Sequence, residues 1–215
     1  MLSIQCHDVK PRVASSIYDR LDELAINQLQ KSKLGGENAV VLTEMYPDCL
    51  NRLSPDTTDQ AHVHQILMIA DTKYIPTRYK LHVIQNDHKK LQVNTNNEQS
   101  LKEEIEQVLA NVSESQSMLV TGNNVPFIEG TVSLQQLIQH CDVDMQHFLS
   151  SRIWNQALTL CSASRELCSG AAAFACIAPL QRYLDAALYR LRHTDHFYEH
   201  TLRALAADVT HTHSS

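Results

Sequence analysis

The sequence predicts an α+β fold, with a mixed or antiparallel sheet and helices packed on it in residues 1–131 and a mostly helical part in residues 132–209. Apolar and polar residues alternate in several short segments of the first part, which is the period of half-buried strands. From Ser133 onward apolar residues recur every three or four positions, the period of a helix, and no lysine follows Lys102. No hinge rich in Pro, Gly or Ser separates the two parts. We therefore expect a single α+β domain over residues 1–215, with a flexible tail at 210–215.

Short alternating or apolar segments predict the strands of the first part. Residues 2–6 alternate in this way, and residues 79–83 and 91–93 fit the two arms of a hairpin with Asn86-Asp87 at its turn. Residues 62–70 fit either a buried strand or a short helix, and we favour the strand. Further strands are expected at 39–45, 117–121 and 125–129.

Amphipathic stripes predict the helices. Pro11 opens the first helix, and Gly35-Gly36 supplies the left-handed stop that helix ends favour. Ser100 and Glu103 have the spacing of a capping box, which predicts a helix start there and an apolar stripe up to Val112. In the second part, short connections favour antiparallel neighbours among five helices, expected at 134–141, at 145–161, at 165–178, from 179 and from 195.

Composition and charge restrict the class of protein. The chain has 215 residues, of which 43% are hydrophobic and 20% charged, and its net charge is -6. This charge disfavours attraction to phosphate backbones and anionic lipids, so we expect no nucleic-acid partner and no direct membrane insertion. The first residues lack a secretory signal, and no segment reaches the roughly 20 apolar residues that span a bilayer. We therefore expect a cytoplasmic protein whose six cysteines are reduced and mostly buried.

Histidines near the end of the chain offer one candidate for chemistry. His193, His196 and His200 share one helical face, but at 1.5 Å per residue they span about 10 Å, too far for one ion to contact all three. Only His196 and His200 could share a zinc ion. Phe197 stands where a zinc protease of the His-Glu-x-x-His type needs its glutamate. A solvated polar face is the first interpretation, and a small metal-dependent hydrolase using these histidines is the alternative.

A segment in the second part is apolar on every side. A helix over residues 170–178 must be surrounded by protein, either as a core helix of this chain or as part of a groove for a partner. On the second interpretation the partner would contact apolar and aromatic residues of the last helices. The protein-binding residues we expect are Phe174, Ile177, Tyr183, Leu191 and Tyr198.

Sequence motifs for enzyme chemistry are missing. The chain holds no Gly-x-Ser-x-Gly elbow, no Gly-x-x-x-x-Gly-Lys phosphate loop and no Gly-x-Gly-x-x-Gly fingerprint, and it has five glycines in all. We therefore expect a protein that is not an enzyme and that needs no cofactor or metal.

The chain as a whole resembles a known group of proteins in its size, its acidity and its His- and Gln-rich helices. The stretch from Leu119 to Phe127, followed by Ser133 to Leu137, contributes to this resemblance. The chain resembles the small acidic adaptors and chaperones of bacterial type IV secretion, of the LvgA-like kind. The resemblance implies a non-enzymatic interaction module in a coupling complex, peripheral to the inner membrane through that complex. It implies protein partners, namely partner adaptors, a helical segment of a coupling ATPase, and effectors received for export. A translocated bacterial effector is a further alternative.

Overall fold

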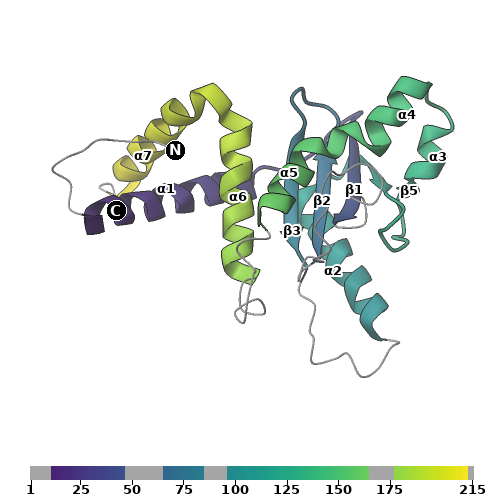
Figure 1. Cartoon of the computed structure of the whole chain (residues 1–215), viewed down its shortest axis with the longest axis horizontal. Coiled ribbons are helices and arrows are strands. Elements are labelled where there is room, and N and C mark those ends of the chain that lie inside the picture. Colours follow the sequence, from purple (N-terminus) through teal and green to yellow (C-terminus); the bar gives the residue numbers. More distant parts are fainter. Residues whose placement is uncertain (1–10, 47–64, 85–95, 165–176, 213–215) are drawn as a thin grey trace.

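The computed structural model describes residues 11–46, 65–84, 96–164 and 177–212 (Figure 1). The expected strands at 2–6 and 91–93, and most of the expected helix at 165–178, lie outside these residues. In chain order the elements are α1 (Pro11–Lys31), β1 (Val40–Tyr46), β2 (Ile66–Asp71), β3 (Arg78–Val83), α2 (Asn96–Val112), β4 (Met118–Thr121), β5 (Val132–Ser133), α3 (Leu134–Ile138), α4 (Val143–Ser150), the 3-10 turn η3 (Arg152–Trp154), α5 (Asn155–Ala163), α6 (Ile177–His193), the 3-10 turn η6 (Thr194–His196) and α7 (Phe197–Thr212).

The five strands form one mixed sheet in the order β3-β2-β1-β4-β5. β1 pairs antiparallel with β2, and β2 pairs antiparallel with β3. On its other side β1 pairs parallel with β4, which pairs parallel with the two-residue strand β5. The predicted α+β class is thus confirmed, as is the strand interpretation of residues 66–70.

Helices cover both faces of the sheet, and the strands between them are buried on both sides. Leu42 and Met68 face a core that η3, α5 and α6 complete with Trp154, Ala157 and Leu184. On the opposite face, residues of β1 and β2 pack with α2, through side chains that include Val41, Leu67, Ile69, Ile105 and Leu109. Since the first cluster draws on both halves of the chain, the helical part is joined to the sheet by a shared core.

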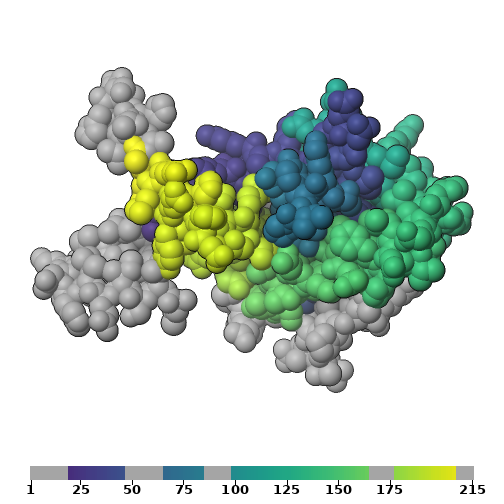
Figure 2. Space-filling view, turned by 90° about the horizontal axis from the view of Figure 1, so that it is seen from above, coloured from purple at the N-terminus to yellow at the C-terminus, as the bar shows by residue number. Residues whose placement is uncertain are grey.

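α1, α6 and α7 extend to one side of the sheet, and we call these three helices the helical arm. In Figure 1, α6 stands between the strands and the pair formed by α1 and α7. Figure 2 shows α6 and α7 in yellow towards one end of the molecule and α3 and α4 in green at the other, with α5 between them. α6 lies mainly against α1 and β3, with smaller contacts to α5 and α7. The expected arrangement of antiparallel neighbours among the last helices is therefore only partly met, because the sheet edge and α1 take most of the surface of α6.

Three local expectations were wrong. Val125–Glu129 forms no strand; Pro126 has no N–H for a ladder, and Val125 and Ile128 are buried side chains of a loop. α2 begins at Asn96, so Ser100 lies inside the helix and caps nothing. The stripe over 145–161 is interrupted at Ser151, whose φ of -143° and ψ of -59° end α4 before η3 begins.

A buried leucine of α6 tests whether the shared core holds the arm to the sheet. Leu184 is fully buried, and Leu184→Ala should destabilise the protein by about 2–5 kcal/mol through the cavity it leaves. Urea denaturation measures the change. Leu202→Ala is the control, because Leu202 is 65% exposed and its loss should change stability by less than about 0.5 kcal/mol. Equal effects of the two substitutions would contradict a core that extends to α6.

Candidate functional site

The outer edge of the sheet is closed by a side chain of α6. Gln181 Nε2 donates to the carbonyl oxygen of Leu81 at 2.8 Å, and Gln181 Oε1 accepts from the Val83 N–H at 2.8 Å. The amide thus replaces a neighbouring strand along β3, whose backbone groups would otherwise be unpaired. This contact sets the position of α6, and with it the position of the helical arm.

Two buried charged groups lie beside this contact. Asp185 is 5% exposed and accepts from Gln181 Nε2 at 3.1 Å, while Lys80 is 7% exposed and donates to the carbonyl of Leu29 in the last turn of α1. Burial raises the pKa of Asp185 to about 6, although Gln181 and Lys80 favour its charged form. Burial, and then repulsion from Arg192, lower the pKa of Lys80 to about 8. For both groups the cost of burial exceeds their mutual attraction.

A third buried charged group, Glu44, serves the turn after β4. The carboxylate of Glu44 accepts from the N–H groups of Met45 at 3.0 Å and Asn124 at 3.3 Å, and burial raises its pKa. A Cβ at Gly122 would lie 2.1 Å from Glu44 Oε2, so the glycine is what allows the carboxylate to approach this backbone. Glu44, Lys80 and Asp185 line none of the three pockets described here. They connect secondary-structure elements and do not face a ligand in these pockets.

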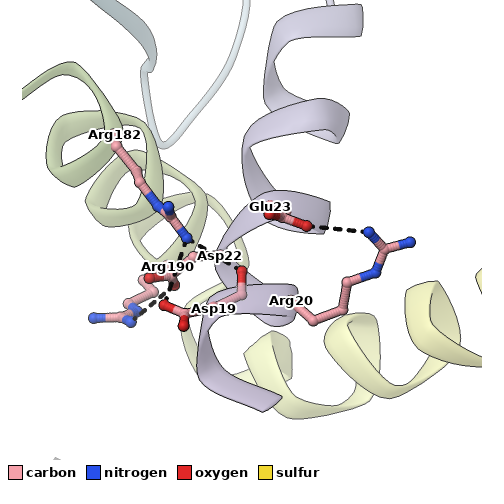
Figure 3. Close-up of polar contacts among 6 residues, drawn as sticks. All are labelled: Asp19, Arg20, Asp22, Glu23, Arg182 and Arg190. Carbon is pink, nitrogen blue, oxygen red and sulfur yellow. Dashed lines mark hydrogen bonds and ion pairs between the residues drawn. The ribbon is translucent and has the colours of Figure 1, made fainter. Parts of the chain in front are cut away.

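Ion pairs attach α6 to α1 on the surface of the arm (Figure 3). Arg182 Nη2 lies 3.7 Å from Asp19 Oδ1, and Arg190 Nη2 lies 3.5 Å from Asp22 Oδ1. Arg20 points away from α6 and pairs within α1. Exposed pairs of this kind contribute up to about 1 kcal/mol each, so they orient the two helices more than they stabilise them.

An open groove of about 510 Å³ lies where α1, α6 and α7 meet, and we call it the α7 groove. Asp22, Arg190, Thr194 and Thr201 are the polar residues that line it. The remaining lining residues are apolar or aromatic, namely Leu21, Ala25, Ala186, Tyr189, Phe197 and Tyr198. Such a composition suits an apolar side chain more than a charged substrate.

A second open groove, of about 590 Å³, lies between α5 and α6, and we call it the α5 groove. It shares Asp22, Ala186 and Arg190 with the α7 groove, so the two adjoin along α6. Its further lining is Leu160, Pro179, Arg182, Tyr183, Ala187 and Leu191. Together they form a surface with apolar patches and an Asp22–Arg190 ion pair common to both.

The structure places most of the expected protein-binding residues on this surface. Tyr183 and Leu191 line the α5 groove, and Tyr198, which is 50% exposed, lines the α7 groove. Ile177 is half-buried against the core, and Phe174 lies outside the described residues. The contribution of α1, through Leu21 and other residues of both grooves, was missed because no local pattern indicates which distant helix faces α6.

The histidine cluster differs from the arrangement that a zinc site would need. His193 and His200 lie with ring centroids 4.0 Å apart, whereas His196 is exposed and lies 3.6 Å from Glu199. Burial, then His200 and Arg192, lower the pKa of His193 to about 4. Within the described ranges no three His, Cys, Asp or Glu side chains are grouped so that they could hold a metal ion. Cys161 is a buried thiol, and Cys141 is a half-buried one.

Comparison with known proteins identifies no relative, since no family model, no curated protein and no solved structure matches the chain. None of the helices in the described part of the chain is both long and apolar enough to cross a membrane. The resemblance to type IV secretion adaptors therefore stays a prediction.

Loss of the amide of Gln181 should loosen α6 from β3. In Gln181→Ala the Leu81 carbonyl and the Val83 N–H lose their partner, which should cost about 1–3 kcal/mol in urea denaturation. Gln135→Ala on the exposed part of α3 is the matched control and should be nearly neutral. Hydrogen exchange at Val83 should accelerate only in Gln181→Ala, and unchanged exchange would contradict the edge contact.

The buried carboxylate of Asp185 should make stability depend on pH. Its pKa is raised from 3.8 to about 6, so between these pH values the folded protein binds more protons than the unfolded chain and its stability falls as pH rises. Asp185→Asn carries no charge at this position. Its free energy of unfolding, relative to that of the wild type, should therefore rise by up to about 3 kcal/mol between pH 4 and pH 7. Urea denaturation across this range measures the difference. Asp195→Asn, at an exposed position, is the control, and a constant difference for Asp185→Asn would contradict the assignment.

Proposed function

We propose that this protein is a non-enzymatic protein–protein interaction module that binds a partner polypeptide on its helical arm. The observation that carries the proposal is the pair of adjoining grooves along α6, which place apolar and aromatic side chains of α1, α5, α6 and α7 at the surface. Grooves between helices that are lined in this way commonly receive the apolar face of a partner helix. Tyr198 and Leu202 add two exposed apolar side chains on α7.

The distribution of ionisable groups also supports binding over catalysis. Catalytic acids and bases with shifted pKa values normally face a cavity that admits substrate. Here Asp185 and Lys80 are buried under α6, and the ionisable groups of the two grooves are Asp22, Arg182, Arg190 and tyrosines. Three of these are held in ion pairs between α1 and α6. They suit a polar rim around an apolar contact.

We place this module, on the resemblance of its sequence, as an adaptor or chaperone subunit of a type IV secretion coupling complex that helps receive effectors. Its partners would then be other adaptors, a helical segment of the coupling ATPase, and effectors. An acidic protein of this size with an open apolar arm is compatible with that role.

Binding to the arm can be tested with charged substitutions at exposed aromatic residues. Tyr198→Asp places a charge in the α7 groove and should lower the recovery of native partners at least about tenfold in a quantitative pull-down from the source cell. Phe127→Asp is the matched control, because Phe127 is 75% exposed and lies in the loop after β4, outside both grooves.

The identity of the partners tests the second half of the proposal. Recovery of secretion components that depends on Tyr198 supports the adaptor role. Recovery that is equal for wild type, Tyr198→Asp and Phe127→Asp would contradict binding through the arm. Appearance of the protein itself outside the cell would favour the translocated effector. Circular dichroism of each variant establishes that the helices are intact.

A further inference from the structure

A third and smaller pocket lies between the β2–β3 turn and the last turns of α6. Its volume is about 130 Å³, and it is lined by residues 74–79 together with Leu188, Leu191 and Arg192. Sites for drug-sized molecules occupy roughly 300–1,000 Å³, so this pocket admits only a small chemical group. It shares Leu191 with the α5 groove but is otherwise separate, so a role for this pocket is independent of the proposed function.

Two half-buried arginines line this pocket from different elements. Arg78, the first residue of β3, stacks its guanidinium 3.5 Å from the centroid of the Tyr74 ring. Arg192, in the last turn of α6, donates to Ser32 Oγ at 2.9 Å. Each contact uses one face or one N–H of a guanidinium that has five N–H donors, so the described residues leave most donors of both groups available.

Neither arginine is neutralised by a carboxylate within the part of the chain that the structure describes. Asp71 pairs with Arg78 in the β2–β3 register, but its carboxylate accepts from the N–H groups of Gly35 at 2.6 Å and Lys73 at 2.9 Å. The end of α6 contributes only about half a negative charge. Two guanidinium groups therefore leave the pocket with a net positive charge.

The neighbouring ionisable groups respond to this charge. Burial, and then repulsion from Arg78, lower the pKa of Arg192 below its ordinary value, and only Tyr74 opposes this. Burial lowers the pKa of His193 as well, with repulsion from His200, Arg192 and Arg78 adding to it. Two cations that line one pocket of about 130 Å³, with no acid paired to either of them in the described residues, are unfavourable unless an anion joins them.

We propose that the pocket formed by Tyr74, Arg78 and Arg192 binds a phosphate group. A phosphate carries close to two negative charges at neutral pH and three strong acceptor oxygens, which match two guanidinium groups and the hydroxyl of Tyr74. A carboxylate carries one charge and is satisfied by one bidentate arginine, so it would leave the second uncompensated. The hydroxyl of Tyr79 donates to the Ile153 carbonyl and is already engaged.

Isothermal titration calorimetry of the full chain with inorganic phosphate tests the site, with sodium chloride added to keep the ionic strength constant. The wild type should show saturable binding with one site. Arg192→Gln and Arg78→Gln should each weaken it about tenfold or more, because each removes a charged donor set. Arg192→Lys keeps the charge without the bidentate geometry. Its affinity for phosphate should therefore lie between that of the wild type and that of the two glutamine variants.

Arg182→Gln is the matched control, since Arg182 lies on the same helix but outside this pocket. It should bind phosphate as the wild type does. Phosphate should also raise the pKa of His193 in an NMR titration, because an anion between Arg78 and Arg192 cancels their repulsion. Phenyl phosphate in a second arm distinguishes the source: tighter binding than inorganic phosphate assigns the site to a phosphorylated molecule, and weaker binding assigns it to the free ion.

Several results would overturn the proposal. These are absence of saturable binding to the wild type, an equal response to acetate, or full binding by both Arg78→Gln and Arg192→Gln when circular dichroism shows them folded. Binding that leaves the pKa of His193 unchanged would locate the phosphate elsewhere and would also overturn the site.

Discussion

The position of α6 against the edge of the sheet is the constraint on which the rest of the structure depends. Successive residues of this one helix point in four directions, and each direction meets a different neighbour. Leu180, Leu184 and Leu188 enter the core, whereas Gln181 closes the edge of β3. Arg182 and Arg190 reach α1, and Tyr183, Ala187 and Leu191 remain at the surface in the α5 groove. Because every face is used, a rotation of α6 would break the edge contact and bury the groove at the same time.

The buried charges at this junction cost stability but restrict the packing. An apolar contact tolerates sliding, because burial is non-directional, whereas the hydrogen bonds from Gln181 to β3 and from Lys80 to the end of α1 exist in one arrangement only. Lys80 and Asp185 stay paired with hydrogen-bond partners, which limits the cost of their burial. Their role, on this interpretation, is to fix the position of the helical arm relative to the sheet. Groups with this role need no accessible cavity, although their pKa values are shifted.

The sequence predicts the parts of this fold that local periodicity controls. The alternation at Tyr79 to Val83 and the apolar run before Asp71 correspond to β3 and β2, and the stripe through Leu184 and Leu188 corresponds to the buried face of α6. Periodicity failed at Val125–Glu129, where buried loop side chains imitate a strand, and at Ser100, where a capping pattern lies inside a helix. Tyr183, Leu191 and Tyr198 were expected as apolar and aromatic residues of the last helices, and in the structure they line the two grooves. The sequence did not indicate the α1 side of the grooves or the placement of Arg78 and Arg192 in one pocket. Both depend on contacts between distant segments, which no local pattern records.

The packing of α7 supports the proposal that a partner binds on the arm. In the part of α7 whose side chains are described, residues 197–206, Thr201 is the one buried residue, so this part of α7 gains little from the hydrophobic effect in the free protein. Its ring contacts, from Phe197 to Tyr189 and from His200 to His193, connect it to α6, and the surface ion pairs of the arm join α6 to α1 without involving it. A partner that fills the α7 groove would bury Phe197 and Tyr198 and supply the contacts that the chain itself does not. By linkage, a partner that binds only the folded arm stabilises it, by an amount that grows with the ratio of the partner concentration to Kd.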